Sequence, residues 1–109
     1  MERQTRSIFI QALFDSIAET QKDSGREVQP MTEDTVPLLD LTGFDSHNGL
    51  EVEIQMSIRL GIEIENLPLH AGKRGTRELK IREIVDVLVN KYGKKFSAVS
   101  TEVEELATH

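Results

Sequence analysis

The segment from Ser46 to Leu60 constrains the fold of this chain most strongly, because its pattern is that of a helix with two apolar sides. At about 100° per residue, the apolar positions form two stripes on nearly opposite sides, Leu50, Ile54 and Ile58 on one and Val52, Met56 and Leu60 on the other. Gly61 is placed to end the helix. One stripe can face the core, and the second needs a neighbouring element, a ligand or another protein. A helix sandwiched between its own neighbours is the simpler interpretation.

Two further helices are predicted from spacing and from their end signals. Residues 3–22 carry a helical apolar stripe that ends before Gly25, and the last helix is expected to begin at Thr76 and to end at Gly93. Residues 24–45 contain two prolines and two glycines without a sustained period, so an ordered loop with one helical turn near Pro37 to Leu41 is expected. The predicted fold is all-α, a small bundle of three or four helices with a long loop between helices one and two.

The chain has 109 residues, which is the size of one domain. Residues 1–93 are expected to form the helical domain, with a short turn or helix over residues 66–75. The polar residues 94–109 are only weakly periodic and are expected to form a flexible C-terminal tail.

Composition excludes several classes of function. The chain has no cysteine, no run typical of a signal peptide and no segment apolar enough to span a membrane, which predicts a soluble cytoplasmic protein without disulfides. The net charge is −6, and residues 32–65 alone carry eight acidic residues against one basic residue, Arg59. Such an acidic segment repels nucleic acid and attracts basic protein surfaces, although acidic surfaces also serve solubility alone.

No constellation in the sequence supports catalysis by the chain itself. Asp45, Ser46 and His47 include the three residue types of a hydrolase triad, but consecutive side chains point apart and cannot form its chain of hydrogen bonds. The three histidines show no ligand spacing, so no metal site is predicted. We therefore expect no catalytic residues, and the chain is not expected to be an enzyme.

Ser46 remains the residue of greatest interest. A hydroxyl at a helix N-terminus usually caps a free backbone N–H, and its loss costs about 1 kcal/mol. The same position also favours negative charge, so a phosphodiester attached to Ser46 would be stabilised there.

The run LTGFDSHNGLEVEIQMSIRLGIEI resembles the signature of acyl carrier proteins, in which an Asp-Ser-Leu tripeptide opens helix two and an extended Ile-x-Ile segment follows it. The resemblance extends from about Ile8 to Tyr92. It implies a bundle of the acyl-carrier-protein type, with 4′-phosphopantetheine covalently attached to Ser46 and with Asp45 as the acid next to it. It also implies that Leu50, Glu51, Glu53 and Ile54 contact partner enzymes, while Val52, Met56 and Leu60 face the core.

Some positions differ from the family's pattern and point to a specialised member. His47 and Asn48 follow the serine where a leucine and an acid are usual, and Ser57 and Ile58 stand where further acids are common. The segment GKRGTRE also lengthens the connection before the last helix. These differences bear on the choice of partner more than on the fold.

The resulting hypothesis is a monomeric acyl carrier protein that holds an acyl or aminoacyl group as a thioester. The group would be delivered to enzymes of a lipid or secondary-metabolite pathway. Its expected partners are a phosphopantetheinyl transferase and acyl-loading and acyl-processing enzymes with basic docking surfaces. The alternative is a non-catalytic acidic helical adaptor that binds a basic protein, with Ser46 as a helix cap.

Overall fold

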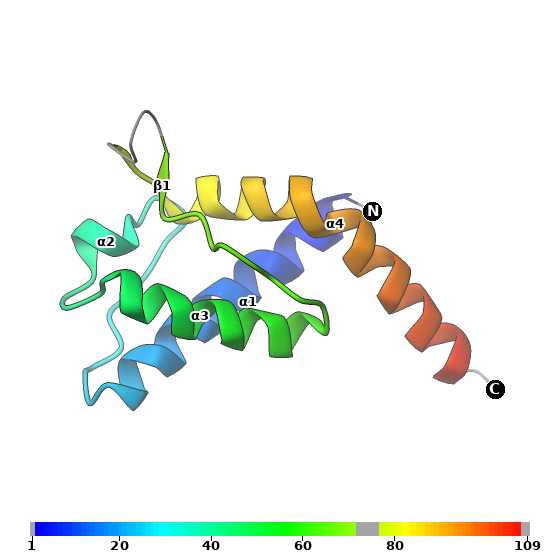
Figure 1. Cartoon of the computed structure of the whole chain (residues 1–109), viewed down its shortest axis with the longest axis horizontal. Coiled ribbons are helices and arrows are strands. Elements are labelled where there is room, and N and C mark those ends of the chain that lie inside the picture. The colour runs from blue at the N-terminus through cyan, green and yellow to red at the C-terminus, as the bar shows by residue number, and fades with distance from the viewer. Residues whose placement is uncertain (1, 72–76, 108–109) are drawn as a thin grey trace.

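Three long helices form the body of the protein in the computed structural model: α1 (Glu2–Asp23), α3 (Ser46–Leu60) and α4 (Ile81–Ala107) (Figure 1). A short helix, α2 (Pro37–Asp40), precedes α3, and two short strands, β1 (His70–Ala71) and β2 (Arg77–Glu78), precede α4. The structure describes residues 2–71 and 77–107, with side chains over residues 4–70 and 77–98. The chain is mostly helical and forms a small bundle, as the sequence predicts.

The C-terminal ends of α1 and α3 agree with the local signals in the sequence. Helix α1 ends two residues before Gly25, which adopts a left-handed φ of 76°. Helix α3 has the predicted bounds, and Gly61 ends it with a φ of 68° while its N–H donates to the Ser57 carbonyl. The predicted helical turn after Pro37 is also confirmed, because Pro37 lies in the first turn of α2, where no backbone N–H is needed.

The core lies where α1 packs against both α3 and α4. Helix α1 contributes the fully buried Phe9, Leu13 and Ile17 to it. Helices α3 and α4 contribute aliphatic side chains, namely Val52, Met56, Leu60, Ile81, Ile84, Val85 and Leu88. The two stripes of α3 therefore have different environments, since the stripe that contains Met56 faces the core and the opposite stripe does not.

Helix α4 continues beyond Gly93, so the predicted helix end at that residue is wrong. Gly93 is buried, and a Cβ on it would lie 3.9 Å from the Thr5 methyl carbon and 3.5 Å from Val89. Further on, the Phe96 ring meets Phe9 edge to face, with ring centroids 5.4 Å apart. Packing of Gly93 and Phe96 against α1 thus carries the helix past the glycine. The helix ends at Ala107, within residues that the sequence assigns to a flexible tail.

The connection between α3 and α4 forms a short β-ribbon, and the predicted turn or helix over residues 66–75 is wrong for the part that the structure describes. Strands β1 and β2 pair antiparallel, with His70 opposite Glu78. The predicted helix start at Thr76 lies outside the described residues. The residues after β2 place the helix start at Ile81, because Leu79 donates its backbone N–H to Leu69 instead of joining the helix.

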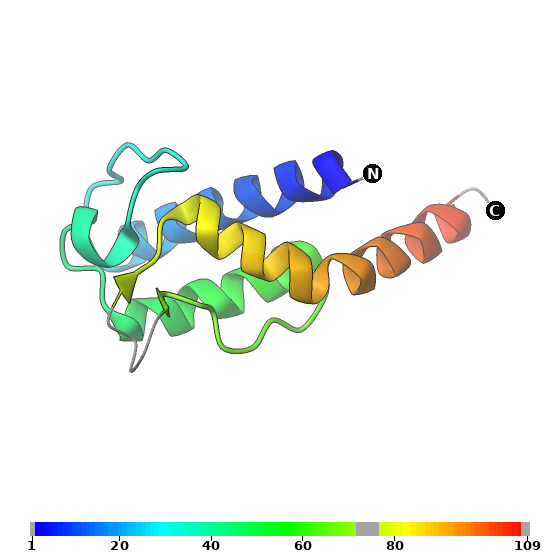
Figure 2. The same cartoon turned by 90° about the horizontal axis from the view of Figure 1, so that it is seen from above.

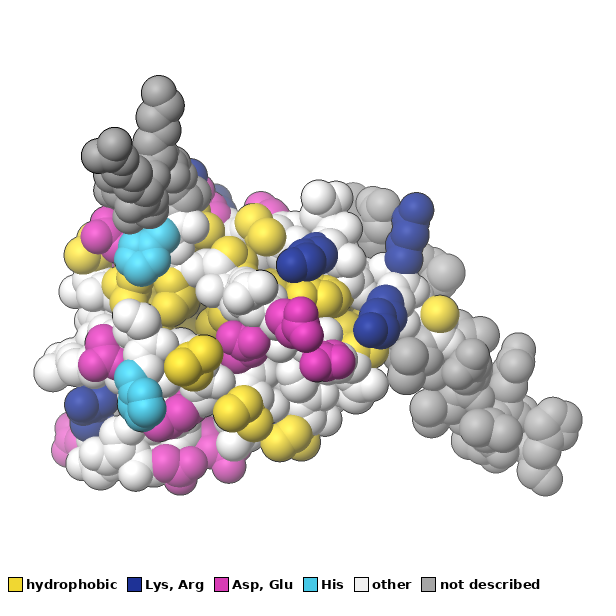
Figure 3. Space-filling view, viewed as in Figure 1, with side chains coloured by type: hydrophobic (Ala, Val, Ile, Leu, Met, Phe, Trp, Pro, Cys, Tyr) yellow, Lys and Arg dark blue, Asp and Glu magenta, His cyan; other side chains and the backbone are white. Residues whose placement is uncertain are grey.

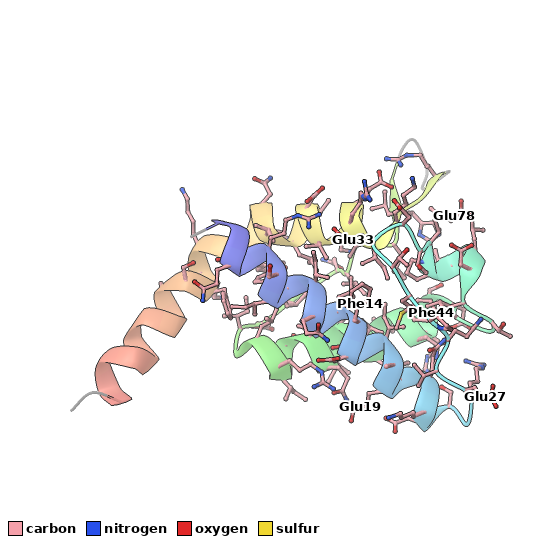
Figure 4. The ribbon with its side chains drawn as sticks, turned by 180° about the vertical axis from the view of Figure 1, so that it is seen from behind. Phe14, Glu19, Glu27, Glu33, Phe44 and Glu78 are labelled. Atoms are coloured by element: carbon pink, nitrogen blue, oxygen red, sulfur yellow. The ribbon has the colours of Figure 1, made fainter. Side chains whose placement is uncertain are left out.

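The loop after α1 caps the start of α4. The first N–H groups of α4, at Ile81 and Arg82, donate to the carbonyls of Thr35 and Glu33 at 2.8 and 2.9 Å. The Glu33 carboxylate also binds Arg6 of α1 at 2.9 Å, and Figure 4 shows Glu33 beside the start of α4 (Figure 4). This carboxylate is the main cause of the raised pKa of Arg6.

The connections gather at one end of the bundle. Figure 2 shows that the loop after α1, α2 and the ribbon lie at the end where α3 begins, while the last part of α4 extends from the opposite end (Figure 2). The start of α3 is therefore surrounded by irregular segments. By contrast, the C-terminal half of α4 lies far from it.

The packing of Phe96 generates a stability prediction. Phe96→Ala removes the ring contact with Phe9 and should lower the free energy of unfolding by about 1 to 3 kcal/mol. Urea unfolding followed by circular dichroism measures this loss. Lys95→Ala changes the exposed neighbouring residue and should leave the midpoint nearly unchanged. Equal midpoints for both variants would show that α4 is not anchored beyond Gly93.

Candidate functional site

Asp45 and Asn48 fix the start of α3 by reciprocal hydrogen bonds. The Asp45 carboxylate accepts from the backbone N–H groups of His47 and Asn48 at 3.0 and 3.1 Å. In return, the Asn48 side-chain oxygen accepts from the Asp45 N–H at 3.1 Å. This is a capping box, with Asn48 in the place of the usual Glu or Gln.

Ser46 is the first residue of α3 and is not its cap, so the interpretation of this serine as the capping residue is wrong. Asp45 fills that role, because its carboxylate satisfies the N–H groups that a Ser46 hydroxyl would otherwise serve. Ser46 is exposed, and among the described residues its hydroxyl has no hydrogen-bond partner in the structure. Its hydroxyl is therefore accessible to an incoming reagent.

The residues around Ser46 are not arranged for hydrolysis. The Asp45 carboxylate is directed at the backbone, and His47 Nε2 lies 3.7 Å from Glu51 on the next helical turn. No chain of hydrogen bonds links Asp45, His47 and Ser46. Within the part of the chain that the structure describes, no group of three or more His, Asp or Glu residues is arranged to hold a metal ion.

A groove with a volume of about 260 Å³ opens beside Ser46. One side is the first half of α3 and the other is the segment that leads into β1, with these lining residues: Ser46, Gly49, Leu50, Glu53, Asn66, Leu67, Leu69 and His70. Gly49 lets the two sides meet, because a Cβ there would stand 2.7 Å from Leu69 Cδ1. The groove is lined by leucine side chains together with the Ser46 hydroxyl, the Glu53 carboxylate, the Asn66 amide and the His70 ring.

Polar side chains hold the far wall of the groove in place. The Glu53 carboxylate accepts from the Asn66 and Leu67 N–H groups at 3.0 and 3.5 Å. The Ser57 hydroxyl accepts from the Ile64 N–H at 2.9 Å and donates to the Glu53 carbonyl at 3.0 Å. These contacts tie the wall to α3.

Tyr92 ties the same segment to α4. Its hydroxyl donates to the Glu65 carbonyl and accepts from the Glu65 N–H, both at 3.0 Å. The segment that forms the wall is therefore attached to two helices, and it has one defined position relative to Ser46.

The predicted docking residues differ in their environments. Leu50 and Ile54 are 58% and 61% exposed, and Ile58 continues the same row with 70% exposure. Figure 3 shows apolar side chains along α3 with acidic side chains on both sides (Figure 3). Glu51 faces His47, whereas the Glu53 carboxylate is engaged by the groove wall. Leu50 and Ile54 are therefore free to meet a partner, while Glu53 has an intramolecular role.

Much of the predicted acidity is engaged within the protein. Glu33 and Asp34 pair with Arg6 and Arg82, and three other acids accept backbone N–H groups, namely Asp40, Asp45 and Glu53. Over the described residues, no side-chain partner is found for Glu63 and Glu65, which are exposed. Glu33 and Asp34 thus meet a positive charge, whereas the acids that accept only backbone N–H groups keep their negative charge.

Sequence reasoning missed the far wall of the groove, above all Leu69 and His70. These residues lie more than twenty positions after Ser46 and belong to no regular helical or strand pattern. Leu69 is 8% exposed and fills the space over Gly49. Gly49, the fourth residue of α3, is the one local signal that another segment approaches the helix closely at this point.

Comparisons with protein-family models, with curated protein sequences and with solved structures found no match to this chain. Over the described residues, no helix combines the length and the apolar character that crossing a membrane requires. The function is therefore argued from the site itself.

The capping arrangement predicts that two neighbouring substitutions differ in their effect on the free energy of unfolding. Asp45→Ala removes the helix cap and should lower the free energy of unfolding by about 1 kcal/mol. Ser46→Ala removes an unbonded exposed hydroxyl and should change it by less than about 0.5 kcal/mol. Parallel urea titrations measure both values. A larger loss for Ser46→Ala than for Asp45→Ala would return the capping role to the serine.

The intramolecular role of Glu53 predicts an effect on the groove wall. Glu53→Ala should speed amide hydrogen exchange at Asn66 and Leu67 roughly five- to tenfold, because these N–H groups lose their acceptor. Glu51→Ala is the matched control on the same helix and should leave both amides unchanged. Unaltered exchange in Glu53→Ala would mean that this carboxylate does not hold the wall.

Proposed function

We propose that the protein is an acyl carrier protein and that Ser46 carries 4′-phosphopantetheine. The observation that carries this proposal is the Ser46 hydroxyl, which is exposed, unbonded and placed at the start of α3 beside a groove. The resemblance of the surrounding sequence to the carrier signature supports the same residue. The position also meets a physical requirement, because a helix N-terminus stabilises an attached phosphate.

Attachment requires a separate transferase that uses coenzyme A. The Ser46 oxygen attacks the phosphorus next to the pantetheine half of coenzyme A, and the bond between its two linked phosphates breaks. The adenosine bisphosphate half leaves, and the hydroxyl proton passes to a base of the transferase. The product is a phosphodiester on Ser46 with a free thiol at the end of the arm, which then carries an acyl or aminoacyl group as a thioester.

The chain itself catalyses no step of this function. Its contribution is to present the arm and to be bound by each enzyme in turn. The exposed Leu50 and Ile54 next to Ser46 form an apolar contact surface, with Glu51 at its edge. Basic residues around the entrance of a partner's active site complement the acidic side chains of this face and speed encounter.

The role of Asp45 follows from the cap. The carboxylate fixes the first turn of α3, so it sets the direction in which the Ser46 hydroxyl leaves the helix. A transferase that binds this turn meets the serine in one defined orientation. Asp45 thereby supports attachment through position and does not need to contact the prosthetic group.

The adaptor alternative uses the same acidic helix without a modified serine. In that case Ser46 is dispensable, and Ser46→Ala leaves partner binding intact. A carrier instead loses its loading and all pathway function when Ser46 is changed, while its fold persists. The two functions are therefore separated by one substitution.

The proposed function predicts covalent modification of one serine. The purified chain, incubated with coenzyme A and a broad-specificity phosphopantetheinyl transferase, should gain the mass of one phosphopantetheine group. Ser46→Ala should gain none, and Ser7→Ala, which alters another exposed serine, should behave as the wild type. Intact-mass spectrometry reads the result. A folded wild type without any gain would overturn the carrier proposal and favour the acidic adaptor.

A further inference from the structure

Among the groove's lining residues that the structure describes, His70 is the one that can become positively charged. The groove's other polar lining side chains are the Ser46 hydroxyl, the Glu53 carboxylate and the Asn66 amide, and the remaining lining residues are Gly49, Leu50, Leu67 and Leu69. A phosphodiester on Ser46 would place a permanent negative charge at the edge of this groove. A protonated imidazole is the group that can neutralise it there.

The carboxylates close to Ser46 would repel a phosphate attached to it, and a cation in the groove would offset this repulsion. Asp45 precedes the serine, and Glu53 lines the same groove. Both carboxylates already accept backbone N–H groups, so they remain as anions that repel a phosphate. Without a cation, the phosphate and the first part of the arm would favour solvent over the groove.

The structure presents His70 in a defined place. His70 lies in β1, and the backbone on either side is held by the pairing with β2 and by the hydrogen bond from Leu79 to Leu69 at 2.9 Å. The ribbon is joined to α4 through Arg77, which pairs with Glu83 at 2.7 Å. This ion pair is the main cause of the lowered pKa of Glu83, and it leaves Arg77 engaged.

Over the part of the chain that the structure describes, the charged groups that face His70 come from two elements. Glu53 lies across the groove on α3, and Glu78 is the cross-strand partner of His70 in β2. A phosphate on Ser46 would add a third anion to these two carboxylates. His70 itself is exposed and has no hydrogen-bond partner among the described residues, so its ring is available.

His47 provides an internal contrast. It directly follows Ser46 in sequence, yet it does not line the groove. Its side chain is 81% exposed and lies 3.7 Å from Glu51. His47 is the histidine nearest to Ser46 in the sequence, but His70 is the one that shares a groove with it.

We propose that His70 binds the phosphodiester on Ser46 when its imidazole is protonated, so that residence of the arm in the groove depends on pH. This inference rests on the proposed function, because it requires a modified Ser46. At a pH at which the imidazole is protonated, the arm lies along the groove beside Leu50 and Leu67. At a higher pH the imidazole is neutral, and the arm moves into solvent, where partner enzymes can reach it.

Phosphorus-31 NMR of the modified protein tests the proposal. A phosphodiester does not titrate near neutral pH, so any change of its resonance with pH must come from a neighbour. In the wild type the resonance should shift over the pH range in which an imidazole changes its charge. His70→Gln should make it independent of pH, and His47→Gln should retain the shift. His70→Lys should hold the low-pH position throughout, because its charge persists.

The outcomes separate the two proposals. A chain that takes up no phosphopantetheine overturns the proposed function. A modified chain whose resonance is flat in the wild type, unchanged by His70→Gln or flattened by His47→Gln overturns the role of His70 alone. Because His70 is exposed, circular dichroism should show the same fold for all variants.

Discussion

The reciprocal hydrogen bonding of Asp45 and Asn48 is the contact on which the geometry of the site depends. It sets the residue at which α3 begins and leaves the Ser46 hydroxyl outside the capping network. Successive side chains of the helix are about 100° apart, so residues two positions apart point to nearly opposite sides. Met56 accordingly lies in the core and Ile54 in solvent.

The exposed row on α3 is costly for an isolated protein, since Leu50, Ile54 and Ile58 leave adjacent apolar surface in water. The core is already supplied by the opposite stripe, so these residues add nothing to folding. Acidic side chains on both sides of the row disfavour contact between two copies of the chain. The same arrangement favours a basic partner, which can cover the row and match its charge.

Local signals in the sequence were sufficient for α3 and insufficient for α4. Asp45 and Gly61 act within one helical turn, so the bounds of α3 can be read without knowledge of the fold. Gly93 carries an equally clear stop signal, but burial against Thr5 and the ring contact of Phe96 outweigh it. The groove wall could not be predicted from local signals. The contact of Leu69 with Gly49 depends on hydrogen bonds of Glu53, Ser57 and Tyr92 to the segment before Leu69, and these join residues far apart in the sequence.

The engaged acids change what kind of recognition this surface supports. The sequence assigns eight acidic residues to positions 32–65, and the cap, the groove wall and the arginine pairs occupy four of them. A partner therefore meets an apolar row with acidic side chains on both sides. This charge speeds encounter and is screened by salt, whereas the apolar contact sets how long a complex lasts. In the proposed carrier function, exchange between successive enzymes would depend mainly on how closely each one fits Leu50, Ile54 and Ile58.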